Sequence, residues 1–276
     1  MRLKNQIYTG ANNKKALFDL TIPEQFNGKL LLFLHGYKGF KDWGCWNLME
    51  DFFLKKHYGF CKFNFSHNGG TVQNGIDFPD LNAFANNRYS YELTDTLKMI
   101  DILHQTVKVK IDDFILVGHS RGGGIATLAS TEERVNKLIT LASVSDLESR
   151  FPKNEKFEDW KNSGTYFVNN ARTKQRMTHN FSFYTDFIEN RKRLDISSVT
   201  KHISVPCLHI HGDKDSSVLP FESERLANLT NGTYLEIKNT QHTFDAKHPW
   251  EVQELPPKMK EMCTLMDIWI KKQAQH

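Results

Sequence analysis

The 276-residue chain has little cysteine and no long apolar run. Cys45, Cys61, Cys207 and Cys263 lie far apart and none belongs to a Cys-x-x-Cys pair, so they are interpreted as buried free thiols rather than a disulfide framework. No segment approaches the roughly 20 apolar residues needed to span a bilayer, and residues 1–6 contain no apolar stretch of signal-peptide length. We therefore expect a soluble cytoplasmic protein with no stable membrane association.

Long runs of like charge are also missing. The formal net charge is only +4, and clusters such as Arg191-Lys192-Arg193 do not exceed those on an ordinary solvated face. We therefore expect no nucleic-acid partner. With 39% hydrophobic residues, 25% charged residues and 20 Phe, the chain is long enough for one globular α/β domain carrying an insertion. The oligomeric state stays open, a homodimer included.

Short apolar runs alternate with longer helical stretches, which is typical of a mostly parallel sheet with helices on both faces. The opening segment, residues 6–23, is broken by Gly10-Ala11-Asn12-Asn13 and resembles an antiparallel hairpin at the sheet edge. A helix over 90–106 is expected to place Glu92 and Asp101 on its polar side. Strands are predicted over 30–34, 60–65, 114–117, 138–141, 207–210 and 234–237, and helices over 46–57, 90–106, 123–130, 220–229 and 256–272.

This alternation stops after residue 144. Residues 145–202 are charged, rich in Asn and interspersed with aromatic side chains such as Trp160 and Tyr166, before Val205-Pro206 resumes the strand pattern. An insertion at this position would hang over the crevice where open α/β sheets bind ligands. We expect residues 145–202 to form a cap over the active site, and residues 1–144 and 203–276 to form the core. The alternative is that residues 145–202 form an insertion on the protein surface that has no function.

The most informative motif is Gly118-His119-Ser120-Arg121-Gly122, directly after the strand over 114–117. A strand running into Gly-x-Ser-x-Gly is the sequence form of a serine nucleophile elbow. The flanking glycines let the neighbouring backbone pass without a Cβ clash, while the tight turn lifts the serine hydroxyl clear of the sheet. Ser120 is therefore the candidate nucleophile.

Two further loops follow strands and supply the partners that a serine nucleophile needs. His211-Gly212-Asp213-Lys214-Asp215 follows the strand over 207–210, and Gln241-His242 follows the strand over 234–237. A histidine must take the serine proton, and a buried carboxylate must hold the imidazole in the right tautomer. The order Ser120, Asp215, His242 is that of α/β hydrolases, and all three residues should converge on one edge of the sheet.

Each partner has rivals. Asp213 competes with Asp215 but could instead close the turn, and His248, His209 and His211 compete with His242. The grouping of His209, His211, Asp213 and Asp215 could suggest a metal cluster, but no third histidine has suitable spacing. We expect no metal and no cofactor.

The strand over 30–34 ends in His35-Gly36-Tyr37, which places a flexible turn beside the elbow. The backbone N–H groups of Tyr37 and Arg121 could point together at a developing oxyanion. His35 is interpreted as a structural histidine that bonds loop backbone. His119 is expected to point away from Ser120 and to pack within the elbow.

With these motifs in place, the chain resembles the α/β-hydrolase superfamily over nearly its whole length, and more narrowly the esterase and serine-aminopeptidase-like branch that includes bacterial cinnamoyl and feruloyl esterases and monoacylglycerol lipases. The resemblance implies nucleophile, acid and base roles for Ser120, Asp215 and His242, and oxyanion donation by the backbone of Tyr37 and Arg121. Two departures, Ser66-His67-Asn68-Gly69 after the fourth strand and Arg121 after the nucleophile, are expected to reshape or charge the pocket mouth. The motifs that carry this resemblance are His35 to Gly39, Asn64 to Gly69, Gly118 to Gly122, His211 to Asp215 and Gln241-His242.

The sequence thus favours a serine hydrolase that cleaves a carboxylic ester of a small or medium acyl group through an acyl-enzyme intermediate. The aromatic side chains of residues 145–202 suggest an aromatic acyl group, unless they form only the core of that segment. Thioesterase and aminopeptidase activities use the same groups, and a non-catalytic ligand receptor would keep the fold. An aminopeptidase should need an acidic group to hold the substrate ammonium, for which the segment offers Glu155, Glu158, Asp159, Asp186 and Glu189.

Overall fold

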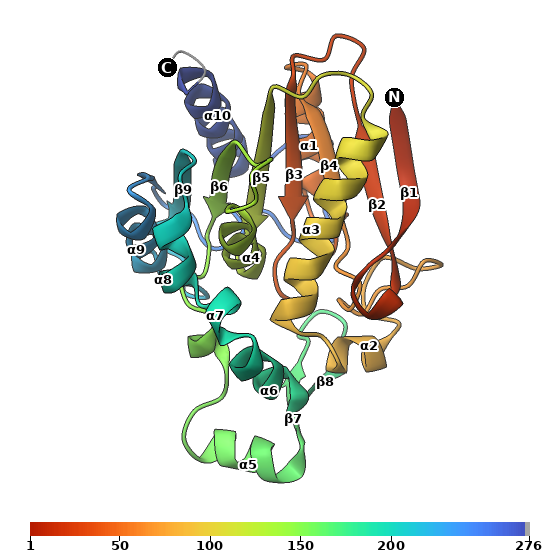
Figure 1. Cartoon of the computed structure of the whole chain (residues 1–276), viewed down its shortest axis with the longest axis vertical. Coiled ribbons are helices and arrows are strands. Elements are labelled where there is room, and N and C mark those ends of the chain that lie inside the picture. The colour runs from red at the N-terminus through yellow and green to blue at the C-terminus, as the bar shows by residue number, and fades with distance from the viewer. Residues whose placement is uncertain (274–276) are drawn as a thin grey trace.

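The computed structural model describes residues 1–273 and is built around one eight-stranded, mostly parallel sheet (Figure 1). β1 pairs antiparallel with β2, and β2 pairs antiparallel with β4, whereas all other neighbours in this sheet are parallel. The predicted α/β class is confirmed, including the antiparallel hairpin at the edge. In spatial order the strands are β1 (Arg2–Thr9), β2 (Lys15–Thr21), β4 (Gly59–Phe63), β3 (Lys29–Leu34), β5 (Asp113–His119), β6 (Lys137–Leu141), β9 (Cys207–Gly212) and β10 (Thr233–Ile237).

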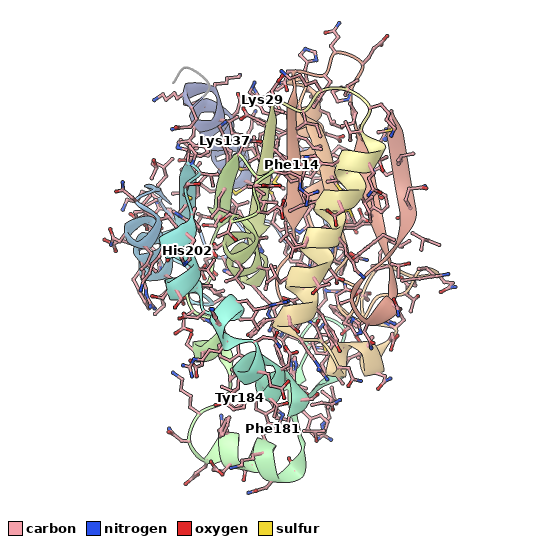
Figure 2. The ribbon with its side chains drawn as sticks, in the orientation of Figure 1. Lys29, Phe114, Lys137, Phe181, Tyr184 and His202 are labelled. Atoms are coloured by element: carbon pink, nitrogen blue, oxygen red, sulfur yellow. The ribbon has the colours of Figure 1, made fainter. Side chains whose placement is uncertain are left out.

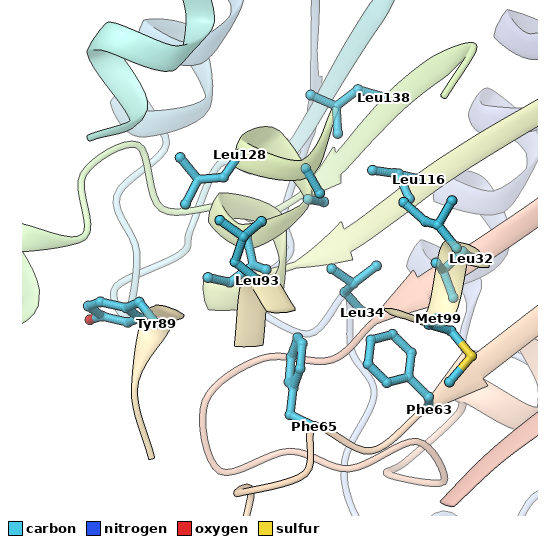
Figure 3. Close-up of a cluster of buried hydrophobic side chains, with 14 of the residues drawn as sticks. Leu32, Leu34, Phe63, Phe65, Tyr89, Leu93, Met99, Leu116, Leu128 and Leu138 are labelled. Atoms are coloured by element: carbon cyan, nitrogen blue, oxygen red, sulfur yellow. The ribbon is translucent and has the colours of Figure 1, made fainter. Parts of the chain in front are cut away.

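Helices cover both faces of the sheet, because side chains of a buried parallel strand alternate between two apolar layers. Leu30, Leu32 and Leu34 of β3 pack in the layer beneath α3 and α4, which Figure 3 shows in close-up. Leu31 and Phe33 pack in the opposite layer, with side chains of α1 and α10. The helices on the sheet are α1 (Trp46–Leu54), α3 (Tyr89–Thr106), α4 (Arg121–Ala129), α9 (Phe221–Thr230) and α10 (Pro257–Lys272).

Residues 145–202 add no strand to the large sheet. The part of the segment from residue 155 to residue 189 lies beyond the carboxyl ends of the parallel strands, whereas residues 196–202 pack on the sheet core beside α4 and α9 (Figure 1). Figure 2 shows Phe181 and Tyr184 of this segment at the opposite end of the molecule from Lys29 and Lys137, where β3 and β6 begin. Between its helices the segment forms a separate antiparallel hairpin that the sequence did not predict. Its elements are α5 (Glu155–Ser163), β7 (Thr165–Asn169), β8 (Arg176–Asn180), α6 (Ser182–Glu189), α7 (Arg191–Leu194) and α8 (Ile196–Val199).

Most aromatic side chains of this segment pack against one another, and their cluster continues into the core through Tyr89 of α3, whose ring centre lies 4.6 Å from that of Phe183. Trp160, Phe183 and Phe187 are buried and pack around Phe151 at ring separations of 5.1 to 5.9 Å. A short helix, α2 (Leu81–Ala85), was also missed by the sequence interpretation and packs against β8. None of the helices in residues 1–273 is long and apolar enough to cross a membrane.

A buried network of ion pairs fills the space between β2, β4 and the loop that leads from β3 into α1. Lys62 of β4 is fully buried, and its ammonium lies 2.6 Å from Asp19 Oδ2, 2.5 Å from Asp42 Oδ1 and 3.5 Å from Glu50 Oε2. Lys41 contacts the same two aspartates at 2.9 and 2.5 Å. The loop before α1 is thereby fastened to the sheet by charges that water does not screen.

We predict that Lys62→Met lowers the free energy of unfolding by about 3 kcal/mol or more, because three carboxylates would lose a buried cationic partner. Urea unfolding followed by circular dichroism measures this change. Lys238→Met is the matched control, since Lys238 pairs with Glu236 at the exposed surface and its loss should cost less than about 0.5 kcal/mol.

The effect of Lys62→Met should shrink in acid. Burial alone would raise the pKa of Asp19, but the Lys62 and Lys41 ammonium groups and the Asn5 N–H hold it well below its ordinary value. The folded chain therefore binds fewer protons than the unfolded chain, and this stabilisation is present above pH about 4 and is lost as pH falls below it. Urea unfolding at pH 7 and pH 3 should give a smaller difference between wild type and Lys62→Met at pH 3; an equal or larger difference would contradict this role.

Candidate active site

Ser120 lies at the sharp turn between β5 and α4. Its backbone has φ 56° and ψ −122°, a conformation that non-glycine residues rarely adopt and that marks stored strain. The turn depends on close backbone approach, because a Cβ added at Gly122 would lie 2.4 Å from the carbonyl oxygens of Leu34 and His35. The geometry is that of a nucleophile elbow.

The structure brings Asp215 and His242 into direct contact. His242 Nδ1 lies 2.6 Å from Asp215 Oδ2, while Asp215 Oδ1 accepts the N–H groups of Ser217 and Val218 at 2.8 and 3.0 Å. Burial alone would raise the pKa of Asp215, but hydrogen bonds from His211 and His242 hold it well below its ordinary value. Asp215 is therefore an ionised carboxylate that fixes the orientation of the His242 ring.

A second histidine shares the same carboxylate oxygen, a role the sequence interpretation missed. His211 Nε2 lies 3.0 Å from Asp215 Oδ2 and 2.9 Å from the Val218 carbonyl, and His211 Nδ1 lies 2.7 Å from Ser223 Oγ. Since a carbonyl can only accept, the proton sits on Nε2 and Ser223 donates to Nδ1. The fully buried His211 thus orients Asp215 from behind; its spacing of four residues from Asp215 was the available signal.

The rival residues have other partners. Asp213 Oδ1 accepts the Asn239 N–H at 2.6 Å and so closes the turn. His209 is buried between the hydroxyls of Thr140 and Thr230 at 2.7 and 2.9 Å, and burial lowers its pKa to about 3. His248 Nδ1 accepts the Gly44 N–H at 2.9 Å. Within residues 1–273, no group of three or more His, Cys, Asp or Glu side chains could hold a metal ion.

Two further histidines support the loops around Ser120. His119 Nε2 donates to the His242 carbonyl at 2.9 Å, so the elbow itself holds the loop of His242. Burial lowers the pKa of His119 to about 3 and that of His35 to about 4, which keeps both rings neutral. His35 Nδ1 donates to the Gly36 carbonyl at 2.9 Å and Nε2 accepts the Phe65 N–H at 3.3 Å, which confirms its interpretation as a structural histidine.

Tyr37 and Arg121, whose backbone amides are the candidate oxyanion donors, line a common cavity with Ser120. Arg121 is the first residue of α4, where a backbone N–H has no partner within the helix. The two side chains contact each other, since the Arg121 guanidinium lies 4.1 Å from the centre of the Tyr37 ring. Tyr37 Oη is in turn 2.6 Å from His179 Nε2 of β8. Residues 145–202 are thereby tied to the loop that carries one candidate oxyanion donor.

Two cavities meet at Ser120 and His242. The first, the tryptophan cavity, has a volume of about 300 Å³ and contains Trp43 and Trp46 together with residues 170–172 of the β7–β8 turn. The second, the cationic cavity, has a volume of about 440 Å³. It is lined by Tyr37, Lys38, Tyr89, Ser120, Arg121, Val144, Leu147, Arg150, Tyr166, Val168, Ser217, Val218 and His242.

The sequence prediction for Glu92 was wrong. Glu92 is buried, not on a polar helix face, and its Oε1 lies 3.5 Å from Arg121 Nη1 and accepts Asn87 Nδ2 at 2.7 Å. Burial raises the pKa of Glu92 above its ordinary value. The departure at Arg121 does charge the pocket, as expected, whereas residues 66–69 line neither of the two cavities.

The structure contains no hydrogen bond between Ser120 Oγ and His242, both of which lie in the described part of the chain. Such contacts are often long in substrate-free sites and tighten when substrate binds. Because Ser120 and His242 line the same two cavities, there is room for a hydrogen bond between them to form.

The sheet topology, the elbow and the chain order of the loops that carry Ser120, Asp215 and His242 define the α/β-hydrolase fold. More particularly, the chain belongs to the prolyl oligopeptidase family, whose model matches residues 56–272. Curated relatives include the protein named "Putative esterase/lipase 2" of Mycoplasma pneumoniae, 26% identical over 58% of this chain and 60% of the relative, and "Putative esterase/lipase 1" of the same organism, 25% identical over 66% and 78%. The chain thus spans less than two thirds of the first of these.

Solved structures share the fold over almost the whole chain. Est1E from Butyrivibrio proteoclasticus with bound ferulic acid has a TM-score of 0.72 at 16% identity, covering 98% of this chain and 100% of that one. DcsB in complex with its substrate analogue has a TM-score of 0.71 at 12% identity and covers 99% of both chains. The resemblance to the esterase branch of the α/β hydrolases is confirmed by these findings together.

We predict that Gly122→Ala destabilises the protein by about 2 kcal/mol or more, because the new methyl group would press on two main-chain carbonyl oxygens that cannot move independently. Thermal and urea unfolding measure the loss. Gly124→Ala in the same helix is the control: its methyl group would meet side-chain atoms only, the nearest being Val144 Cγ2 at 2.8 Å, and the alanine gains helix propensity, so its cost should be smaller than that of Gly122→Ala by about 1 kcal/mol or more. Equal effects at the two glycines would show that the elbow is not held by this backbone contact.

Proposed function

We propose that the protein is a serine hydrolase that cleaves carboxylic esters through an acyl-enzyme intermediate, with Ser120 as nucleophile, His242 as base and Asp215 as the orienting acid. The observation that carries this proposal is the 2.6 Å contact between His242 Nδ1 and Asp215 Oδ2 beside a serine held in a strained elbow. Because Nδ1 is committed to the carboxylate, only Nε2 of His242 is left to accept a proton from Ser120.

In the proposed reaction, Ser120 Oγ attacks the ester carbonyl carbon while His242 Nε2 takes the hydroxyl proton. The carbonyl oxygen becomes negative and is stabilised by the amides of Tyr37 and Arg121, where losing one donor typically costs roughly 10²- to 10³-fold in rate. The tetrahedral intermediate then expels the alcohol, which receives the proton from His242. Water repeats the sequence on the acyl-enzyme and releases the carboxylic acid.

The lining of the two cavities favours ester over aminopeptidase chemistry. An aminopeptidase must hold the substrate's free ammonium group, for which a carboxylate in the site is the natural partner. Among the described residues no Asp or Glu lines either cavity at Ser120. Glu155, Glu158, Asp159 and Glu189 are exposed, and the buried Asp186 accepts Ser90 Oγ at 2.8 Å. We therefore place ester hydrolysis first.

We further propose that residues 145–202 are a cap on a core formed by residues 1–144 and 203–276, whose last three residues lie outside the described part of the chain. The supporting observation is that Tyr166, Val168 and residues 170–172 line the cavities that contain Ser120. A cap in this position would limit the size of the acyl or alcohol group and exclude water.

We predict that Ser120→Ala leaves the unfolding transition nearly unchanged and lowers ester turnover by more than about 10³-fold, because no other hydroxyl occupies the elbow. A panel of 4-nitrophenyl esters of increasing acyl length, methyl ferulate and an aminoacyl 4-nitroanilide should be compared for wild type and Ser120→Ala. A fluorophosphonate should label wild type and not the variant. Ser216→Ala, an exposed serine in the loop after Asp215, is the matched control and should be labelled like wild type.

Each result of this comparison discriminates between functions. Ser120-dependent turnover of esters supports the proposal, and preferential turnover of the anilide would replace it with a peptidase. No labelling of Ser120 and no turnover of any substrate would indicate a ligand-binding protein that has kept the hydrolase fold.

A further inference from the structure

The cationic cavity contains three basic side chains within reach of the proposed nucleophile. Arg121 follows Ser120 directly, Lys38 follows Tyr37, and Arg150 comes from the start of residues 145–202. They belong to three segments that are far apart in sequence, so their proximity is a property of the fold and not of a local run of charge. A cavity of this kind attracts anions, because low-dielectric walls strengthen the field of the charges that line it.

The carboxylates around this cavity do not balance its positive charge. Glu92 contacts Arg121 at 3.5 Å through one oxygen, and its raised pKa reflects incomplete compensation of its own burial. Glu222 pairs with Arg150 and also accepts the Ser145 N–H at 2.9 Å. Glu92 and Glu222 thus pair with two of the three cations, and neither lines the cavity. The third nearby carboxylate, Asp215, is bonded to His211 and His242.

Lys38 is the cation without a partner. It makes no salt bridge with any carboxylate of residues 1–273, and its ammonium instead lies 5.3 Å from the centre of the Tyr37 ring. Burial and the neighbouring Arg121 charge lower its pKa from the ordinary value, so the side chain is held where its charge is costly. Its backbone is in the left-handed region, with φ 55°, which is unusual for lysine. An anion bound between Lys38 and Arg121 would lower the electrostatic cost of both positive charges at once.

Apart from the three basic residues, Ser120, Ser217 and His242, the residues that line the cavity are aliphatic or aromatic. Val144, Leu147, Val168 and Val218 line it together with the rings of Tyr89 and Tyr166. Such walls suit a short hydrocarbon or aromatic body, whereas a polar or cationic body would lose its hydration without compensation. The cavity therefore fits a ligand with an apolar body that bears a negative group.

We propose that the cationic cavity is a subsite for a carboxylate or comparable anion carried by the ester itself, so that the enzyme selects esters with an anionic group a few atoms from the scissile bond. The juxtaposition of Lys38, Arg121 and Arg150 with an apolar wall beside Ser120 carries this inference, which rests on the proposed function. The anion can belong to the acyl group or to the alcohol, and the same cations would recognise either.

The test compares anionic esters with neutral analogues of nearly the same shape. For the acyl side, the 4-nitrophenyl monoester of adipic acid is paired with 4-nitrophenyl methyl adipate; for the alcohol side, 4-acetoxybenzoate is paired with methyl 4-acetoxybenzoate. In wild type, kcat/KM for the anionic member of at least one pair, divided by that of its neutral analogue, should exceed one. This ratio should fall as NaCl rises from 0.05 to 0.5 M.

Lys38→Met is the informative variant, because it removes a charge without leaving a carboxylate unpaired. It should lower the anionic-to-neutral ratio by roughly fivefold or more, mainly through KM, and Lys38→Arg should largely restore it. Lys110→Met is the control: Lys110 precedes β5, whose seven residues separate it from Ser120 by roughly 20 Å, so the ratio should not change.

Binding to Ser120→Ala tests the subsite independently of turnover. Monomethyl adipate and 4-hydroxybenzoate should be titrated into Ser120→Ala and into Ser120→Ala/Lys38→Met by isothermal calorimetry. Weaker binding of at least one of these anions by the double variant supports the subsite even if no tested ester is hydrolysed. A ratio at or below one in both ester pairs, or equal anion binding by the two variants, would overturn the charge selection while Ser120-dependent turnover of neutral esters left the hydrolase function standing.

Discussion

The largely buried guanidinium of Arg121 connects the elbow to the loop after β3, to α3 and to α6. A buried cation is tolerated only when other groups replace its lost hydration. Here Glu92 of α3 supplies a carboxylate, and the faces of Tyr37, Tyr89 and Phe183 lie 4.1, 5.1 and 5.6 Å from the guanidinium. The loop after β3, α3, α4 and α6 are thus all held by one side chain. Its backbone amide is at the same time a proposed oxyanion donor.

The loop between β3 and α1 carries Tyr37, the other proposed oxyanion donor, and is held in place by ion pairs near its α1 end. Tyr37 belongs to the connection between β3 and α1, and the same connection contains Lys41 and Asp42 of the buried ion network. Rigid charge pairs on one side and the Tyr37 to Arg121 contact on the other leave this loop little freedom. Preorganised amides stabilise a developing charge better than mobile ones, because nothing must reorient during the reaction. The buried ions thus support the proposed site from a distance.

The sequence predicted the class of fold and the neighbourhood of the site, because both follow from local patterns. Apolar runs of strand length separated by helices indicate a parallel sheet, and residues just after such strands must share one edge of it. Glu92 shows where this approach fails: a carboxylate in a helical pattern suggests a solvated face, and its partner Arg121 is 29 residues away. The β7–β8 hairpin was missed because its strands are only five residues long: β7 offers a run of just three apolar residues, Tyr166-Phe167-Val168, and β8 has Met177 as its one apolar residue.

The proposed substrate selection and the proposed reaction both depend on Arg121. The fold is common to proteins that share 12 to 16% of their residues with this chain, whereas the cationic cavity is lined in part by side chains from connecting segments and from residues 145–202. Replacing Arg121 would disturb the charge, the Tyr37 contact and Glu92 together, so its loss cannot separate recognition from the reaction. Lys38 shares the cavity but forms no ion pair with Glu92, and its only contact with these groups is that of its ammonium with the Tyr37 ring, at 5.3 Å from the ring centre. The charge of the site can therefore be changed at Lys38 while the elbow keeps its supports.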